Sequence, residues 1–198
     1  MAGVPFVGLT GGLGAGKSEA LRALGALGAA TLSTDAVVHE LLTGEELRDI
    51  IVERLGSEVL RDGRLDRSLI AERVFGDEEA RAWLEGELWP RVGRRVAEWK
   101  QELETLDPAP PAAVVEIPLL FESGMEAAFD ATIAVVADEA VREERAGTRG
   151  HAAVTEREGR QLSQAEKSQR ADFTVRNDGT ILELKAELEE ILRQIRKV

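Results

Sequence analysis

A glycine-rich loop near the start of the chain limits most strongly what this sequence can fold into. Residues 11–18 read Gly-Gly-Leu-Gly-Ala-Gly-Lys-Ser and match the pattern GxxxxGKS. Glycines allow the backbone to wrap closely around a phosphate chain, with several N–H groups pointing inward. A strand-like apolar segment, residues 4–9, precedes the loop, and an amphipathic helical pattern follows it. This order predicts a P-loop that ends on a helix N-terminus, where anions are favoured.

We expect the residues of this loop to hold a nucleoside triphosphate in different ways. Lys17 would reach the β- and γ-phosphates as a point charge, and the Ser18 hydroxyl would bind Mg²⁺. The remaining phosphate contacts would come from the loop around Gly12, Gly14, Ala15 and Gly16. The alternative is a glycine-rich turn with an exposed lysine. The motif by itself does not identify the group that receives the phosphate.

Alternating strand-like and helical patterns predict an α/β fold. Short segments rich in Val, Ile or Ala read as buried strands at 4–9, 112–117, 131–137, 172–176 and, more weakly, 30–33. Strands that alternate with helices form a parallel sheet covered on both faces. Residues 36–106 show no buried strand and read as helices at 37–42, 45–55, 67–74 and 78–103, the last interrupted near Pro90. Capping boxes beginning at Thr155 and Thr180 predict the starts of two later helices.

Composition argues against several classes of protein. The chain has 198 residues and a net charge of −12, and general nucleic-acid or membrane-surface binding needs a basic face instead. No apolar run is long enough to cross a bilayer. The chain has no cysteine, so a disulfide or a thiolate zinc site is excluded. With no export signal visible, we expect a cytoplasmic protein that is a monomer or a weak homo-oligomer.

Carboxylates that follow two predicted strands fit the needs of a kinase with a small acceptor. Such an enzyme needs one carboxylate to orient the acceptor hydroxyl, another near the metal, and arginines around the transferred group. Asp35 fits the first role and Glu116 the second. Asp35 could instead cap the helix at 36–42, and Glu116 could be a strand-end surface charge.

Arginines are concentrated in the segment 141–176. It carries eight Lys or Arg and six Asp or Glu, a local balance of +2. Arg145 and Arg149 lie one helical turn apart, and a polar helical stripe is predicted at Arg157, Arg160, Gln161 and Gln164. A solvated helix with internal salt bridges is the alternative.

Taken together, these residues resemble the dephospho-CoA kinase family. The matching stretches are 8–18, 34–35, 63–69, 74–75, 116–124, 129–130, Arg145, Arg149, Gln161, Gln164, Lys167, 171–172 and 177–179. They follow the order of the family and span nearly the whole chain. The run Ile-Pro-Leu-Leu-Phe-Glu at 117–122 discriminates best, because unrelated proteins share the P-loop. The DxxG and NKxD patterns of regulatory GTPases do not occur.

The resemblance implies an ATP- and Mg²⁺-dependent kinase. Its partners would be ATP and dephospho-CoA, without nucleic acid or membrane. It would phosphorylate the ribose 3′-hydroxyl of dephospho-CoA to give coenzyme A and ADP, the last step of coenzyme A biosynthesis. The implied fold is a three-layer P-loop kinase fold with a parallel five-stranded sheet, a helical substrate-side insertion and a helical lid. The nucleotide-binding core would comprise 1–35, 112–142 and 170–198, the CoA and acceptor-side domain 36–111, and the lid 143–169.

The resemblance also implies roles for individual residues. Asp35 aligns with the aspartate proposed to polarise the acceptor hydroxyl, Arg145 and Arg149 with the lid arginines, and Asn177 with a residue near the adenine. Leu119, Leu120 and Phe121 would shape the acceptor side.

Three positions depart from the family pattern. Trp89 stands before Pro90 where the family usually has histidine, so no role of that histidine carries over. Glu19 replaces the usual Ser or Thr after Ser18, and retains only its backbone N–H for the α-phosphate. Glu116 replaces an aspartate, which implies a longer reach to the metal.

Other functions are compatible with the P-loop. Another P-loop kinase would act on a nucleoside monophosphate or a small alcohol. A nucleotide-dependent binding protein would bind ATP without transferring phosphate. A nucleic-acid-directed ATPase is disfavoured by the charge of −12.

Overall fold

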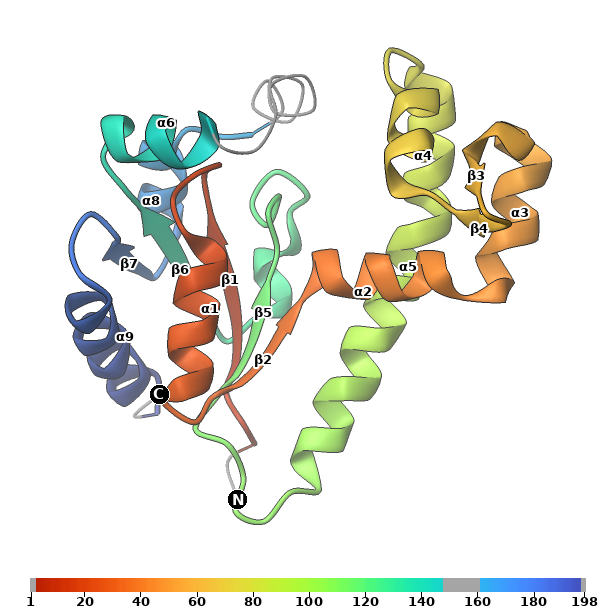
Figure 1. The fold of residues 1–198 in the computed structure, drawn as a ribbon. Coiled ribbons are helices and arrows are strands. Elements are labelled where there is room, and N and C mark those ends of the chain that lie inside the picture. Colours follow the sequence, from red (N-terminus) through yellow and green to blue (C-terminus); the bar gives the residue numbers. More distant parts are fainter. Residues whose placement is uncertain (1–2, 148–160, 197–198) are drawn as a thin grey trace. The chain divides into compact units, whose positions relative to one another are not determined.

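The chain divides into two compact units. A computed structural model describes residues 3–147 and 161–196 (Figure 1). The sheet unit comprises Met1–Ser33 and Glu102–Val198, and the helical unit comprises Thr34–Gln101. In the described part of the chain, no helix combines the length and the apolar character that a membrane span requires.

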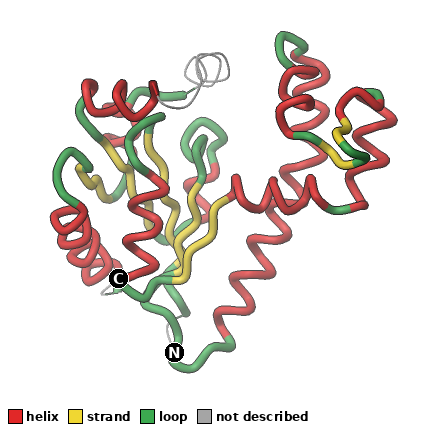
Figure 2. Tube along the Cα trace, viewed as in Figure 1, coloured by secondary structure: helices red, strands yellow, loops and turns green. Residues whose placement is uncertain are grey.

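The sheet unit contains a parallel sheet of five strands in the order β2-β5-β1-β6-β7 (Figure 2). The strands are β1 (Phe6–Gly11), β2 (Ala30–Ser33), β5 (Ala113–Glu116), β6 (Ala131–Val136) and β7 (Phe173–Arg176). All residues of β1 and β5 are buried, as expected of central strands covered on both faces. The five predicted strands and the α/β class are confirmed.

Helices lie on both faces of this sheet and produce three layers (Figure 1). Helix α1 (Lys17–Ala26) packs against α9 (Ile181–Ile195), while α8 (Gln164–Arg170) contacts β1 and β6. Leu9 belongs to the apolar core between the sheet, α1 and α9. Successive side chains of a strand point to opposite faces, so Thr10 points away from that core and towards α8. Helix α6 (Glu139–Gly147) follows β6.

Among the described residues, two capping boxes start helices of the sheet unit. The Thr180 hydroxyl accepts from Glu183 N, and the Glu183 carboxylate accepts from Thr180 N at 2.7 Å. This box was predicted and is confirmed, whereas the predicted box at Thr155 lies outside the described residues. Ser163 and Glu166 form a second box at the start of α8.

The box at Ser163 corrects one prediction. Because α8 begins at Gln164, residues 161–163 precede the helix. Gln161 and Gln164 therefore do not share one helical stripe. Arg157 and Arg160, the other members of that predicted stripe, lie outside the described residues.

The helical unit is packed around an apolar core of its own. Its helices are α2 (Thr34–Thr43), α3 (Glu45–Leu55), α4 (Arg67–Val74) and α5 (Glu78–Glu104), the last of which continues past the unit boundary. Leu47 and Ile51 of α3 and Ile70 of α4 are buried in this core. The Asp66 carboxylate begins α4 by accepting from Ser68 N and Leu69 N.

Two details of the helical unit differ from the sequence prediction. Helix α5 continues through Pro90, so the predicted interruption is wrong. A proline removes one hydrogen bond of the ladder, and this 27-residue helix accommodates that loss. A small antiparallel pair, β3 (Leu60–Arg61) and β4 (Arg64–Leu65), was not predicted. Each strand has only two residues, too few to show an alternating pattern.

Candidate active site

The carboxyl ends of the parallel strands bring the predicted site residues of the sheet unit to one edge. Leu9 of β1 is in register with Glu116 of β5, and Gly11 of β1 with Val135 of β6. Asn177 directly follows β7. In open α/β sheets, ligands bind outside the carboxyl ends of the strands.

The loop after β1 has the geometry of a P-loop. Gly16 adopts a left-handed conformation, with φ 89°, and forms the N-cap of α1. Lys17 Nζ donates to Gly11 O at 3.0 Å and to Gly12 O at 3.1 Å, so its ammonium lies over the loop. Gly14 also has positive φ, and a Cβ there would lie 2.6 Å from Arg142 O. Gly14 and Gly16 are therefore required because the loop has positive φ at both positions. At Gly14, the backbone of Arg142 also leaves no room for a side chain.

Asn177 packs against the end of the P-loop. Its amide nitrogen donates to Ala15 O at 3.0 Å and to Glu19 Oε2 at 3.3 Å, and the residue is 2% exposed. A Cβ at Gly16 would collide with this amide. Glu19 stands where the family usually has Ser or Thr. Its side chain thus contacts Asn177, the residue predicted to lie near the adenine.

Arg145 lies beside the same loop, as a phosphate-neutralising arginine would. Arg145 Nη1 donates to Asn177 O at 3.0 Å. The same nitrogen would be 3.4 Å from a Cβ at Gly16. Arg149, the second arginine predicted for this role, lies outside the described residues.

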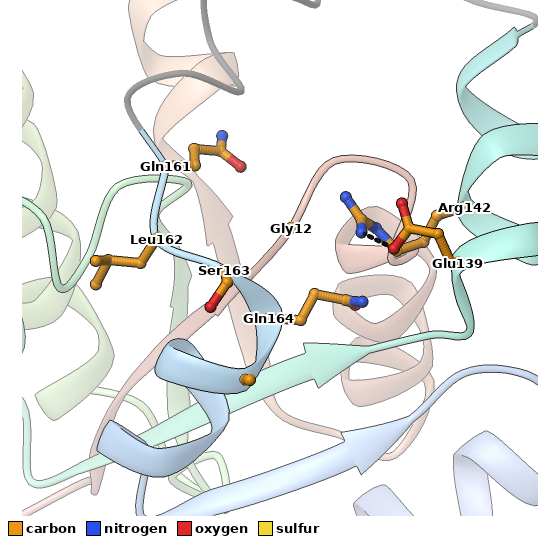
Figure 3. Close-up of a pocket in the computed structure, with 8 residues that line it drawn as sticks. Gly12, Glu139, Arg142, Gln161, Leu162, Ser163 and Gln164 are labelled. Carbon is orange, nitrogen blue, oxygen red and sulfur yellow. Dashed lines mark hydrogen bonds and ion pairs between the residues drawn. The ribbon is translucent and has the colours of Figure 1, made fainter.

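A pocket of about 370 Å³ opens beside Gly12 (Figure 3). This volume falls in the range of ~300–1,000 Å³ typical of small-molecule sites. It is lined by Gly12, Glu139, Arg142, Gln161, Leu162, Ser163, Gln164 and Ala165. The site therefore combines an anion-binding loop with a concave surface built from α6 and the start of α8.

Arg142, which the sequence analysis did not single out, and Gln164, a member of the predicted polar stripe, both line the pocket. Arg142 Nε donates to Leu13 O of the P-loop at 2.8 Å, while Arg142 Nη1 pairs with Glu139 at 2.8 Å. The Gln164 amide bonds to both the N and the O of Ala137, each at 2.9 Å. The partners in Leu13 and Ala137 are backbone groups of segments far along the chain, which no local sequence pattern reveals.

Glu116 is 5% exposed, so it is not the strand-end surface charge that was considered as an alternative. Ile117 N donates to Leu9 O at 2.8 Å, which keeps Glu116 beside the strand that enters the P-loop. In the described ranges, no group of three or more His, Cys, Asp or Glu residues could hold a metal ion.

Asp35 lies in the helical unit, inside the first turn of α2 and two residues after the end of β2. Since α2 begins at Thr34, Asp35 does not precede the helix as the capping alternative required. Its Oδ1 is 3.1 Å from Arg67 Nη2, and the two side chains are 50% and 43% exposed. The Asp35 side chain therefore keeps half of its surface available to a ligand.

The residues predicted to shape the acceptor side follow β5. Leu120 is fully buried and Phe121 is 4% exposed, while Leu119 is half-buried. A Cβ at Gly8 would lie 3.0 Å from Leu120 Cδ2, so Leu120 packs directly on β1. Of the three, Leu119 has the most surface left for a ligand.

Lys167 of α8 is buried next to the strand that enters the P-loop. Its Nζ lies 2.9 Å from Glu122 Oε1 and donates to Pro118 O at 2.7 Å and Thr10 Oγ1 at 3.4 Å. Burial lowers the pKa of Lys167, and the hydrogen bond and charge of Glu122 oppose that shift. Both residues occur in the stretches that carry the family resemblance, but their pairing is visible only in the fold.

Fold and loop together define the class of this protein as a P-loop kinase. Shikimate kinase from Acinetobacter baumannii shares the fold, with a TM-score of 0.50 at 13% identity over 98% of this chain and 94% of that one. A family model described as dephospho-CoA kinase matches residues 5–183. The chain belongs to the dephospho-CoA kinase family, which confirms the resemblance, and it is accordingly an enzyme of the transferase class.

Individual relatives and solved structures are similar to this chain over nearly its whole length. A dephospho-CoA kinase of Protochlamydia amoebophila is 37% identical over 194 residues, covering 96% of each chain. Among solved structures, TT1252 from Thermus thermophilus has a TM-score of 0.80 at 32% identity, covering 98% of each chain. The dephospho-CoA kinase from Campylobacter jejuni has a TM-score of 0.69 at 26% identity, covering 97% of each chain.

Proposed function

We propose that this chain transfers the γ-phosphoryl group of ATP to the ribose 3′-hydroxyl of dephospho-CoA, giving coenzyme A and ADP. This is the last step of coenzyme A biosynthesis, and we place it in the cytoplasm. The observation that carries the proposal is the P-loop at the carboxyl edge of the sheet, in a chain that matches the family model over residues 5–183. We propose the division that the family resemblance implies: a nucleotide-binding core of 1–35, 112–142 and 170–198, an acceptor-side domain of 36–111, and a lid of 143–169, of which 148–160 lie outside the described residues. These bounds differ from those of the two compact units, because the helical unit comprises Thr34–Gln101 and α8 belongs to the sheet unit.

ATP is bound by the P-loop and the start of α1. Lys17 exchanges its bonds to the carbonyls of Gly11 and Gly12 for bonds to phosphate oxygens, which are negatively charged and accept more strongly. Asn177 holds Ala15 and Glu19 in place beside the nucleotide. The proposed ATP-binding residues are Gly12, Gly14, Ala15, Gly16, Lys17, Ser18, Glu19 and Asn177.

Mg²⁺ bound with ATP would be held by Ser18 and Glu116. Mg²⁺ commonly takes one or two protein ligands and completes its shell with water and phosphate oxygens. One hydroxyl at the start of α1 and one buried carboxylate beside β1 match that requirement. When bound, the ion neutralises charge on the β- and γ-phosphates.

Phosphoryl transfer then depends on position and charge. Asp35 orients the acceptor hydroxyl and accepts its proton as it attacks the γ-phosphorus. Arg145 and Arg149 offset the charge on the transferring group. Leu119, Leu120 and Phe121 shape the acceptor side. Little covalent chemistry is required of the protein, because alignment of the two reactants supplies much of the rate.

Analysis of the product tests this proposal. The protein is incubated with Mg²⁺-ATP and dephospho-CoA, a nucleoside monophosphate, shikimate or no acceptor, and products are analysed by mass spectrometry and ³¹P NMR. We expect dephospho-CoA to gain one phosphoryl group on its ribose. Preferred phosphorylation of another acceptor would indicate a different P-loop kinase. ATP binding by calorimetry with no phosphorylated product would indicate a binding protein.

A further inference from the structure

Lys167 joins three segments of the sheet unit with a single ammonium group. It extends from α8 and is fully buried. It reaches Thr10, the residue before the P-loop glycine Gly11, and Pro118, the residue before the acceptor-side segment 119–121. It also pairs with Glu122, directly after that segment.

Further hydrogen bonds close this network. Thr10 Oγ1 donates to Pro118 O at 3.3 Å, so β1 and the loop after β5 are also bonded directly. Leu162 N donates to Glu122 Oε1 at 2.8 Å, which holds the chain that enters α8. The network thus lies between the strand that carries the proposed ATP site and the loop that carries the proposed acceptor residues.

A buried ion pair is a costly way to hold a fold together. Removing two charges from water costs several kcal/mol per ion, and an apolar pair of similar volume is often equally stable or more stable. Glu122 Oε2 is buried and has no hydrogen-bond partner among the described residues, which adds to that cost. Stability alone therefore gives a weak reason for these two charges.

We propose that Lys167 and Glu122 are positioning residues for phosphoryl transfer, which hold the strand that enters the P-loop against the loop after β5. The inference rests on the proposed function, because it takes these two segments as the donor and acceptor sides. Directed bonds from one ammonium specify the distance between Thr10 and Pro118 more narrowly than apolar packing would. Misplacement by about 1 Å can cost about 100-fold in rate.

Neutral variants separate positioning from stability. Lys167→Met leaves the Glu122 carboxylate buried without its cation, and we expect a clear fall in the urea midpoint of unfolding. Lys167→Met combined with Glu122→Gln removes both charges while keeping similar volume, and we expect the midpoint to return close to that of the wild type. If the pair positions the reactants, this stable double variant should have a kcat at least ~10-fold below that of the wild type, while its KM for ATP changes little.

A surface ion pair provides the matched control. Arg193 and Glu190 of α9 lie 2.8 Å apart with side chains 59% and 50% exposed. Arg193→Met combined with Glu190→Gln makes the same chemical changes and is expected to leave kcat unchanged. A Lys167/Glu122 double variant with wild-type kcat overturns the proposal. So does one that loses kcat only in proportion to its unfolded fraction, measured by circular dichroism under assay conditions.

The assay also separates this inference from the proposed function. Wild type and variants are compared on whichever acceptor the wild type phosphorylates best in the panel. If that acceptor is not dephospho-CoA, the proposed function fails, while the kcat of the double variant still decides the positioning role. If the wild type transfers phosphate to no acceptor, both proposals are overturned.

Discussion

Different kinds of contact stabilise two regions of the molecule, namely the sheet edge around the P-loop and the core of the helical unit. At the edge, polar side chains bond to backbone groups of distant segments, as Asn177 does to Ala15 and Arg142 to Leu13. In the helical unit, apolar packing around Ile51 forms the core, and the ion pair of Asp35 with Arg67 is half exposed. Substitutions at the edge should therefore change turnover most, and substitutions in the helical core should change stability most.

The largest effect is expected at the P-loop lysine. Lys17→Ala removes the cation proposed to bind the β- and γ-phosphates, and kcat should fall about 10³-fold, equivalent to ~4 kcal/mol in the barrier. Steady-state kinetics with ATP and dephospho-CoA measure it. Lys185→Ala on α9 is the matched control and should leave kcat unchanged. Activity of Lys17→Ala near that of the wild type would remove Lys17 from the proposed site.

A change in the core of the helical unit should act on stability. Ile51 is fully buried, and Ile51→Ala should lower the free energy of unfolding by ~3 kcal/mol because it leaves a cavity. The neighbouring Ile50 is half-buried, so Ile50→Ala should cost clearly less. Urea denaturation followed by circular dichroism measures both. Equal losses would show that apolar packing at Ile51 does not dominate this unit.

Asp35 tests whether the helical unit also contributes to the chemistry. Asp35→Asn should lower kcat ~100-fold while KM for ATP stays nearly constant, as expected of a residue that acts on the acceptor. Arg67→Ala breaks the same exposed ion pair but keeps the carboxylate, and should change stability by less than ~1 kcal/mol. If both variants reduce kcat equally, the ion pair rather than the carboxylate accounts for the loss.

The smallest effect concerns the cap of α9. The Thr180 backbone N–H, and then its hydroxyl, donate to the Glu183 carboxylate and hold its pKa below the ordinary value. A lowered pKa stabilises the fold above the ordinary value of about 4.3, and this contribution is lost as the pH falls through the folded-state pKa. The stability difference between wild type and Glu183→Gln should therefore shrink at acidic pH. Urea titrations at neutral and acidic pH measure it, and a pH-independent difference would show that the charge of Glu183 does not stabilise the cap.

Local patterns predicted much of the fold, because they depend on neighbours in the chain. The five strands, the P-loop between β1 and α1, and the cap at Thr180 each follow from a few adjacent residues. The interruption predicted at Pro90 was wrong, because a local rule about proline does not include the rest of a long helix. The prediction that Gln161 and Gln164 share one helical stripe was wrong. The spacing of polar residues suggested a helix through Gln161, but the cap at Ser163 starts α8 only at Gln164.

By itself, the sequence determined the glycine-rich loop and the parallel sheet, because glycine spacing and apolar periodicity act over short distances. It also carried the family resemblance, through matching stretches such as the run at 117–122. Only the tertiary structure decided that Lys167 pairs with Glu122 under the P-loop strand, that Asn177 bonds to Ala15, and that Glu116 is buried. These contacts join segments that are far apart along the chain. Their partners are backbone atoms and buried charges, whose positions exist only once the strands have paired in register.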